Sequence, residues 1–335
     1  MRSVVTGGAG FIGSHLVERL VAAGDEVVVI DDLRSGRTEN LAAVQDAVEL
    51  VRADIASDPI DAPFVGADRV FHLAGMADIV PSIERPRAYF ETNVQGTLNV
   101  LEAARAAGAG RLVYVASSTC YGIPEAYPTP EDAPIDTRYP YAHTKYQGEL
   151  LVLHWHRCYG MSNVSLRFFN VYGPRSRTTG TYGAVFGVFL AQKIHGEPFT
   201  IVGDGDQTRD FTYVTDIAEA MVKAADAPDE DVAGEVINVA SGNPQSVNRL
   251  VELLGGPVVH VPKRPGEPDC TWADITKARE RLGWEPTISF ERGVARMLEQ
   301  IDDWRAAPVW TPGAIEKATE TWFAYLGESE RQAPR

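Results

Sequence analysis

A glycine-rich turn near the start of the chain restricts the fold more than any other feature of the sequence. The segment VVTGGAGFIGSHL places Gly7, Gly10 and Gly13 between a short β-rich run and a stretch with helical periodicity. Glycines at this spacing let the backbone turn tightly and approach a pyrophosphate, while the N-terminus of the following helix offers N–H groups and a positive dipole end. A glycine triplet alone is weak evidence, because an ordinary strand–helix turn can contain one. Between a strand and a helix it predicts a dinucleotide site, which would also include Phe11 and Ile12.

The first half of the chain alternates β-rich runs with helical segments. Apolar runs with the length of buried strands occur at 3–6, 26–30, 48–53, 69–73, 112–116 and 164–169. Helical periodicity is clear in the segments that contain Leu16 and Leu101, which end near Gly24 and Gly108. Apolar strands joined by helices are typical of a parallel sheet covered on both faces. We therefore expect an α/β fold with a doubly wound Rossmann sheet.

The pattern changes near residue 172, after which glycine and proline separate shorter elements. This change predicts a smaller α/β substrate domain that is interleaved with the first domain. We expect residues 1–172 to form the Rossmann domain, together with a returning segment near 207–240. Residues 173–335 would form mainly the substrate domain. The apolar run 235–240 is the strand expected to return to the first sheet.

Charge and cysteine content exclude several classes of protein. A net charge of −15 and a pI near 4.9 argue against nucleic acid or an anionic membrane as a partner. Cys120, Cys158 and Cys270 lack CxxC spacing, so no disulfide framework is expected. His154 and Cys158 share one helical face, but two ligands are fewer than zinc needs, so we expect no metal site. With no signal peptide or membrane span expected, a cytoplasmic location is the default.

Acidic residues after the second and third β-rich runs are candidates for cofactor recognition. Asp31 follows Gly13 by 18 residues, where a carboxylate can accept hydrogen bonds from a ribose 2′-hydroxyl and repel a 2′-phosphate. This position favours NAD over NADP, although the nearby Arg34 keeps NADP open. Asp54 fits a contact with the adenine ring or a plain loop cap. Further residues expected at the cofactor are Asp32, Asp54, Ile55, Leu73, Ala74 and Asn93.

The segment YPYAHTKYQGE contains the candidate catalytic pair. Tyr141 and Lys145 are four residues apart at the start of an expected helix, so their side chains share one face. A phenol with a pKa of about 10 is a poor base at neutral pH. A neighbouring ammonium and a cationic nicotinamide ring would stabilise the phenolate and lower that pKa. A YxxxK pattern alone often marks a surface pair, but beside the glycine turn it predicts a general acid/base.

Together these motifs resemble those of the extended short-chain dehydrogenase/reductases that act on nucleotide sugars, and among them the UDP-glucose 4-epimerase-like members. The resemblance covers essentially the whole chain and rests on TGGAGFIGSHL, HLAG, NVQGTLNVLEAAR, SSTCYG, YAHTK, RFFNVYGPR, GDGDQTRDFTYVTD and RPGEPDCTWAD. It implies that Tyr141 is the acid/base, that Lys145 binds the nicotinamide ribose, and that Ser117 hydrogen-bonds the sugar hydroxyl being oxidised. The implied reaction is epimerisation of a UDP-sugar at C4 through a transient 4-keto intermediate.

The loop VASSTCYG favours epimerisation over related reactions. Similar 4,6-dehydratases carry a Thr-Asp-Glu run here, and related decarboxylases keep a Glu, whereas this chain has Ser117, Ser118 and Thr119. Hydroxyls orient a substrate but do not serve as the acid or base of an elimination at neutral pH. The alternatives that stay open are a reductase or dehydrogenase with net redox and, less favoured, a dehydratase or a non-catalytic NAD-binding relative.

The resemblance also implies substrate contacts in the second half of the chain. Asn170 matches a residue whose amide reaches the sugar diphosphate, and Arg209 and Arg264 match arginines that neutralise it. A guanidinium suits phosphate because it offers two parallel donors. Glu267 matches a ribose-binding residue that is often Asp in relatives. Ser117, Ser118 and Tyr141 would contact the sugar.

Thr271 matches a position beside the C2 substituent of the sugar. A tyrosine at this position restricts such pockets to plain hexoses, whereas smaller residues admit N-acetyl groups. Thr271 therefore predicts that the enzyme accepts UDP-N-acetylglucosamine as well as UDP-glucose, or a C6-oxidised sugar. The alternative is that Thr271 only packs under its loop.

Two helices have more apolar positions than packing against a sheet requires. They span roughly 93–107 and 141–159, and the second includes Leu150, Leu151, Leu153 and Trp155. The second helix resembles one that forms a four-helix interface in dimers of the family. We therefore expect a homodimer.

Overall fold

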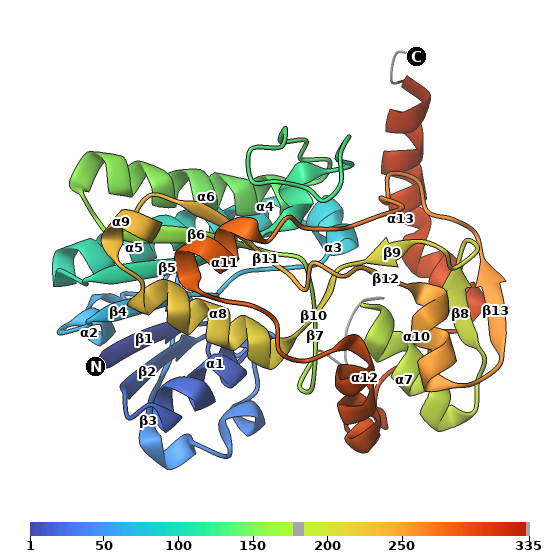
Figure 1. Cartoon of the computed structure of the whole chain (residues 1–335), viewed down its shortest axis with the longest axis horizontal. Helices are drawn as coiled ribbons and strands as arrows, with labels where there is room; N and C mark the ends of the chain where they lie inside the picture. Colours follow the sequence, from blue (N-terminus) through green and yellow to red (C-terminus); the bar gives the residue numbers. More distant parts are fainter. Residues whose placement is uncertain (177–183, 333–335) are drawn as a thin grey trace.

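The computed structural model describes residues 1–176 and 184–332, with side chains described up to residue 327. A larger lobe is built on a central sheet, and a smaller lobe lies beside the carboxyl ends of its strands (Figure 1). Among the described residues, no helix is both long enough and apolar enough to cross a membrane.

The central sheet has seven parallel strands in the order β11-β6-β5-β4-β1-β2-β3. Its strands are β1 (Arg2–Thr6), β2 (Glu26–Asp31), β3 (Val48–Arg52), β4 (Arg69–His72), β5 (Arg111–Ser117), β6 (Asn163–Phe168) and β11 (Val236–Val239). This confirms the expected α/β Rossmann fold. The strand order reverses direction between β1 and β4, and ligands of such sheets bind at the carboxyl ends beside that point.

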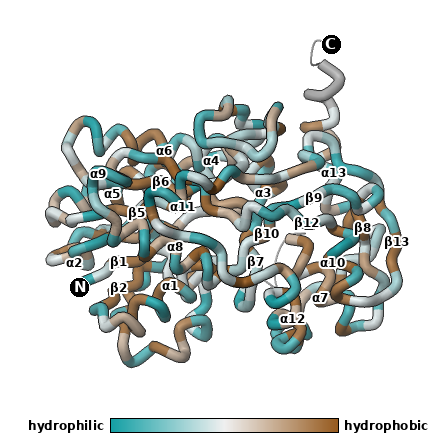
Figure 2. Tube along the Cα trace, viewed as in Figure 1, coloured by the Kyte–Doolittle hydropathy of each residue, from teal (hydrophilic) through white to brown (hydrophobic). Residues whose placement is uncertain are grey.

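Helices cover both faces of the sheet, as Figure 1 shows. One face is covered by α1 (Phe11–Ala22), α8 (Val214–Asp226) and α11 (Thr276–Leu282); the other by α2 (Asp61–Phe64), α5 (Gly96–Ala107) and α6 (Pro140–Tyr159). Successive strand residues point to opposite faces, so Val5 packs with Leu16 of α1 while Val4 packs with Leu101 of α5. Brown, apolar segments accordingly run along the strands in Figure 2.

Short helical segments surround the carboxyl edge of the sheet. After β4 come α3 (Ile79–Glu84), α4 (Pro86–Phe90) and a π-helical turn, Glu91–Gln95, which leads into α5. A 3-10 turn, Ser118–Tyr121, follows β5, and two more 3-10 turns, Thr38–Leu41 and Gln45–Ala47, follow β2. These segments bring loops from several strands to one edge, where the site lies.

The smaller lobe consists of three two-stranded sheets and several helices. Its strand pairs are β7 (Asn170–Tyr172) with β10 (Phe211–Tyr213), β8 (Phe199–Val202) with β13 (Val258–Val261), and β9 (Thr208–Arg209) with β12 (Gln245–Ser246). Its helices are α7 (Val185–His195), α10 (Val247–Leu254), α12 (Phe290–Glu299) and α13 (Pro312–Gln332), with a 3-10 turn at Ile301–Trp304; α9 (Asp229–Val232) precedes β11. Phe189, Leu250 and Trp304 belong to its separate apolar core.

Candidate active site

The glycine turn has two positions, Gly7 and Gly13, at which a side chain could not replace hydrogen. Gly7 has φ +72°, and a Cβ there would lie 2.6 Å from the backbone nitrogen of Ala74. A Cβ on Gly13 would lie 2.2 Å from the carbonyl oxygen of Gly7. Gly10 caps α1 without a side chain, so the N–H groups of Phe11 and Ile12 begin the helix directly beside the turn. This geometry suits a pyrophosphate at the N-terminus of α1.

Asp31 ends β2 with its carboxylate folded back over the glycine turn. Its Oδ2 accepts a hydrogen bond from the backbone N–H of Ala9 at 3.0 Å, and its Oδ1 accepts one from Leu33 at 2.9 Å. Burial raises the pKa of Asp31, and these two hydrogen bonds oppose that rise because they favour the charged form. The carboxylate is therefore fixed beside the glycine turn, where the adenosine ribose of a bound dinucleotide would lie.

Arg34, whose positive charge could favour the 2′-phosphate of NADP, is paired with acidic neighbours. Its Nη2 lies 2.9 Å from Asp54 Oδ2 and 3.2 Å from Asp32 Oδ2. Asp54 also accepts a hydrogen bond from the backbone N–H of Ala56 through Oδ1, so it caps its own loop. Two carboxylates beside this guanidinium leave the region unfavourable for the extra charge of a 2′-phosphate.

Ile55 faces the protein core. It is 3% exposed, and a Cβ on Gly96 would lie 2.7 Å from its Cδ1 atom. Its side chain thus fills the space that Gly96 leaves in α5. Any contact of Ile55 with a cofactor would involve its backbone.

Asn93 ties the loop after β4 to the catalytic helix. Its Oδ1 accepts a hydrogen bond from the backbone N–H of Met76 at 2.7 Å, and its Nδ2 donates to Met76 O and to Thr144 Oγ1, both at 3.0 Å. Upstream in the same loop, the backbone N–H groups of Leu73 and Ala74 donate to the backbone oxygen and the hydroxyl of Thr6. The loop is therefore held between β1 and α6.

Ser117 and Tyr141 meet at the carboxyl edge of the sheet. Ser117 ends β5, and its Oγ lies 2.9 Å from Thr119 Oγ1 and accepts the backbone N–H of Thr119. Ser117 lies near enough to Tyr141, the second residue of α6, to lower the pKa of its phenol. Ser118 opens the 3-10 turn beside them. The Ser117 hydroxyl thus lies next to the phenol, and the Thr119 hydroxyl is hydrogen-bonded to it.

The pKa of Tyr141 is set mainly by burial in the chain without NAD. Burial raises it above the ordinary value, and the Ser117 hydroxyl only partly offsets the rise. Lys145 is buried as well, with its Nζ 4.3 Å from the centre of the Tyr114 ring, and burial lowers its pKa to about 7 although Glu149 opposes this. Burial therefore dominates at both groups in the chain without NAD, and the expected lowering of the Tyr141 pKa by an ammonium and a cationic nicotinamide ring stays a prediction.

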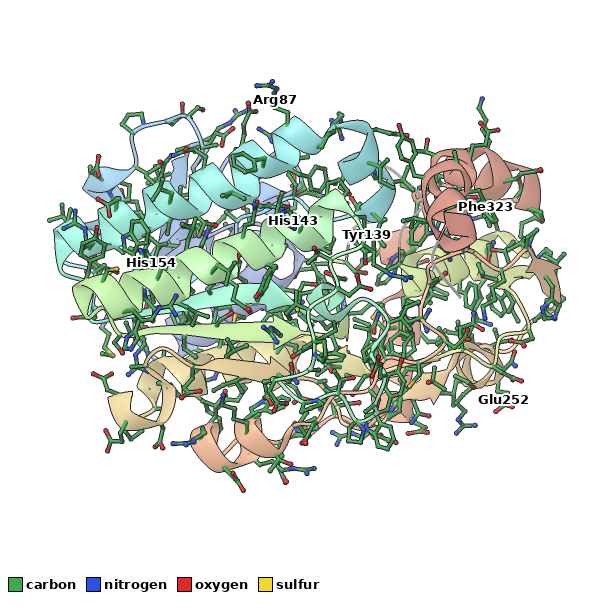
Figure 3. All side chains as sticks on the ribbon, turned by 90° about the horizontal axis from the view of Figure 1, so that it is seen from above. Arg87, Tyr139, His143, His154, Glu252 and Phe323 are labelled. Carbon is green, nitrogen blue, oxygen red and sulfur yellow. The ribbon has the colours of Figure 1, made fainter. Side chains whose placement is uncertain are left out.

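Several residues around Tyr141 were not anticipated from the sequence. The ring of Tyr139 stacks on it at 6.5 Å and 10°, and the ring of Tyr89 meets it edge-on at 6.5 Å. The charge of Asp78 raises the pKa of Tyr141, and burial raises the pKa of the nearby Cys120 thiol to about 12. The only sequence signal for Tyr139 is its place two residues before Tyr141. Figure 3 shows Tyr139 at the start of α6, on the side that faces α13.

A second cluster in the smaller lobe joins the three charged residues expected at the substrate. Arg209 Nη2 lies 2.8 Å from Glu267 Oε1, and Arg264 Nε lies 3.2 Å from Glu267 Oε2. Arg209 and Glu267 line a cleft of about 190 Å³, together with Gln207 and Lys263. The three charged residues together carry one net positive charge, which suits a diphosphate, whereas the rest of the cleft lining includes Asp204, Asp206 and Asp269.

Thr271 links Asn170 to the backbone of the smaller lobe. Its hydroxyl donates to Asn170 Oδ1 at 2.8 Å and accepts the backbone N–H of Asp210 at 3.0 Å. Asp210 is itself buried and accepts hydrogen bonds from Ser241 and Ala273. Thr271 therefore fixes the orientation of the Asn170 amide.

Comparison with known proteins places this architecture among enzymes. A family model described as "NAD dependent epimerase/dehydratase family" matches residues 3–240. Among curated relatives, the UDP-glucose 4-epimerase of Mycolicibacterium smegmatis is 38% identical, over 89% of this chain and 98% of its own length. UDP-glucuronic acid decarboxylase 1 of Arabidopsis thaliana is 37% identical, over 90% of this chain and 70% of its own.

Solved structures show the same similarity. The UDP-N-acetylglucosamine 4-epimerase of Methanobrevibacter ruminantium, in complex with UDP-N-acetylmuramic acid, matches with a TM-score of 0.83 and 33% identity over 89% of this chain and 98% of its own. The UDP-glucuronic acid 4-epimerase of Bacillus cereus, in complex with UDP-glucuronic acid and NAD, has a TM-score of 0.83 and 31% identity over 90% of this chain and 99% of its own.

Proposed function

The chain belongs to the NAD-dependent epimerase/dehydratase family, and from this premise we propose that it inverts C4 of a UDP-sugar through a transient 4-keto intermediate. The enzyme is an NAD-dependent isomerase by class. The sugar it acts on, and the role of each residue below, belong to the proposal.

The cofactor NAD fits the groups at the carboxyl edge of β1 and β2. The turn containing Gly7 and Gly13 has no room for a Cβ, so the backbone can approach a pyrophosphate at the start of α1. Asp31 would hold the adenosine ribose, and Lys145 would hold the nicotinamide ribose. When bound, NAD supplies the acceptor and donor of the hydride.

The observation that carries the proposal is that Ser117, at the end of β5, lies near enough to Tyr141 to lower the pKa of its phenol. The hydroxyl of Ser117, which can orient a sugar hydroxyl, thus lies beside the phenol of Tyr141, which can exchange a proton with that sugar hydroxyl. Tyr141 would remove the proton from O4 as C4 is oxidised, while Ser117 holds that oxygen. After the 4-keto sugar presents its other face, Tyr141 would return the proton as C4 is reduced. The proton thus ends on the oxygen from which it came, and no net redox change occurs.

The main alternatives require groups that differ from those of the 117–119 loop. Elimination or decarboxylation uses an acidic residue in this loop in the enzymes that this chain resembles, and here the loop has only hydroxyls. The curated relatives include decarboxylases, so the comparison alone does not separate the two reactions. The loop chemistry favours epimerisation. A net-redox enzyme would consume or release NADH with each turnover.

The residues of the smaller lobe support a UDP-sugar as the substrate. We infer that Arg209 and Arg264 bind the diphosphate and that Glu267, between them, binds the ribose of the nucleotide. Thr271, a small side chain, would leave room for a C2 N-acetyl group, so UDP-N-acetylglucosamine is proposed beside UDP-glucose and its C6-oxidised form. Solved relatives act on each of these sugar types.

The test is incubation of the purified protein, without added NAD, with UDP-glucose, UDP-N-acetylglucosamine and UDP-glucuronic acid in turn. We expect NMR to show the C4 epimer of at least one of them at equilibrium, with no accumulation of NADH. Stoichiometric NADH would support the net-redox alternative. Release of CO₂ from UDP-glucuronic acid, with formation of a pentose, would support a decarboxylase.

A further inference from the structure

The C-terminal helix α13 packs beside the site and is not one of the helices that cover the central sheet. It rises beside the smaller lobe in Figure 1, and Figure 3 shows it facing the start of α6. The family model that matches this chain covers residues 3–240, so it does not extend to α13. The role of α13 must therefore be read from its contacts.

Trp322 of α13 contacts the loop that carries Arg264. It is 5% exposed, and its Nε1 donates a hydrogen bond to the backbone oxygen of Pro265 at 2.7 Å. The guanidinium carbon of Arg264 lies 5.4 Å from the centre of the Trp322 ring, within the range of a cation–π interaction. One turn later, Leu326 packs on Gly266, where an added Cβ would lie 3.5 Å from the Leu326 Cβ. The helix thus holds both the side chain and the backbone of this loop.

The same tryptophan reaches the aromatic residues beside the catalytic tyrosine. Its ring centre lies 6.5 Å from that of Tyr139, which in turn stacks on Tyr141. Thr321, the residue before it, donates a hydrogen bond to Glu84 at the end of α3 at 3.3 Å. α13 is therefore anchored to three segments of the site: α3, the start of α6 and the loop after β13.

We propose that Trp322 is a positioning residue that holds Arg264 toward the substrate diphosphate. In this proposal α13 forms one side of the substrate site whether or not substrate is bound. Arginine loses much rotamer freedom when it binds a phosphate, and a side chain that is already held in place loses less on binding. The Trp322 ring restrains the guanidinium of Arg264, while the hydrogen bond from its Nε1 to Pro265 O restrains the backbone next to Arg264. This inference rests on the proposed function, because it takes a nucleoside diphosphate as the ligand of Arg264.

The experiment is calorimetric titration of UDP and of uridine into the full-length, NAD-loaded protein. Trp322→Leu should raise the Kd of UDP about tenfold, which corresponds to about 1.4 kcal/mol, and should change uridine binding little. Trp322→Phe keeps a ring but loses the N–H donor, so its Kd should rise by a smaller factor, about threefold. Phe323→Ala serves as the matched control, since Phe323 is the next residue of α13 and is 38% exposed; its Kd should equal that of the wild type.

A double-mutant cycle separates positioning from general support of the fold. In an Arg264→Gln background, Trp322→Leu and Trp322→Phe should cause little further loss, because the group that Trp322 positions is already gone. Full additivity, or unchanged UDP binding by both Trp322 variants, would overturn the role of Trp322 and leave the proposed function standing. Wild-type protein that does not bind UDP at all would overturn both. NAD content and Tm, measured on each variant, identify any that fails to fold.

Discussion

At Tyr141 two physical effects act on the pKa in opposite directions. Burial raises the pKa, whereas the Ser117 hydroxyl lowers it, and burial dominates in the chain alone. Lys145 carries only about half of a positive charge near pH 7, because its own pKa is lowered to about 7. A phenolate at this position therefore requires further stabilisation, which a cationic nicotinamide ring would provide. This is the expected reason why such a tyrosine becomes a base only in the complete enzyme.

The first prediction concerns this phenol. Tyr141→Phe should reduce kcat by at least about a thousandfold, because it removes the group that exchanges the proton with O4. NAD should remain bound, since the aromatic ring and Lys145 are kept. Steady-state kinetics on the substrate found by NMR, with NAD content measured by absorbance after denaturation, provide the test.

Tyr139→Phe is the matched control for that variant. Tyr139 is half-buried and stacks on Tyr141, but its hydroxyl has no part in the proposed proton transfer. Its kcat should stay within a few-fold of the wild-type value. If Tyr141→Phe kept a comparable rate, Tyr141 would not be the base.

The second prediction tests Thr271 as a determinant of sugar size. Thr271→Tyr should lower kcat/KM for UDP-N-acetylglucosamine at least tenfold, about 1.4 kcal/mol of transition-state binding, and should spare UDP-glucose. The ring would fill the space proposed for the acetamido group. Competition between the two sugars, followed by NMR, measures the ratio directly.

The structure shows that this substitution has a second effect, which needs its own control. The Thr271 hydroxyl bonds to Asn170 and to the backbone of Asp210, and tyrosine cannot reproduce both bonds. Thr271→Val removes the hydroxyl without adding a ring, so any loss it causes should be equal for the two sugars. Equal losses with Thr271→Tyr as well would show that position 271 does not select by size.

Much of the cofactor side of the site could be predicted from single residues, because the signals are local. The glycine turn, Asp31 and the Tyr141–Lys145 pair each lie within a few positions of a strand end or a helix start. Trp322 could not be found in this way. Its contacts with Tyr139 and Arg264 join segments far apart in the sequence, and no motif marks them.

At the scale of elements, the β-rich runs of the first half predict the strands of the sheet to within a residue or two. Most of these runs are apolar because their strands are covered on both faces, whereas β3, at the edge of the sheet, is partly exposed. β11 is the informative case, since it returns from the second half to pair with β6. The small sheets of the second lobe were not predicted, as strands of two to four residues carry no periodic signal. The domain boundary near residue 172 stays a prediction.

The outer side of α5 and α6 is the surface that we expect to form a dimer interface. Leu150 is 42% exposed and Tyr159 is 55% exposed on α6, and Phe90 of α4 is 49% exposed. A cleft of about 650 Å³ lies next to them, lined by Phe90, Arg87 and His143. Leu151 and Trp155, by contrast, pack partly against the core of the large lobe. The exposed apolar groups therefore lie at fewer positions than the sequence pattern indicated.

The third prediction is that these groups hold two copies of the chain together. Light scattering at micromolar concentration should give the mass of a dimer for the wild type and of a monomer for Leu150→Arg, because a buried unpaired charge is costly at an interface. Val258→Arg, at a position 44% exposed in the smaller lobe, should leave the dimer intact. A monomer mass for the wild type would refute the interface.

At the scale of the whole molecule, one group of buried charges lies around α6. Glu149 and Arg167 form a buried pair with 2.7 Å between Oε1 and Nη2, and Arg167 also donates to the hydroxyl of Tyr121. Lys145, one turn before Glu149, forms no ion pair and donates no side-chain hydrogen bond among the residues that the structure describes. Its burial therefore acts against the charged form, and the folded chain binds its proton weakly.

The fourth prediction follows from that weak binding. The pKa of Lys145 is about 7 in the folded chain and 10.5 at its ordinary value, so between these pH values the unfolded chain binds more protons at this residue. The free energy of unfolding should therefore rise with pH in this window, by at most about 1.4 kcal/mol per pH unit. Urea unfolding of cofactor-free protein at pH 7, 8 and 9 should show this rise relative to Lys145→Met, which lacks the proton. Lys193→Met, which removes a surface lysine that donates to Gly255 O, should keep the wild-type slope. A wild-type slope equal to that of Lys145→Met would mean that Lys145 keeps its proton in the folded chain, and the tyrosine would then have a cation beside it even before NAD binds.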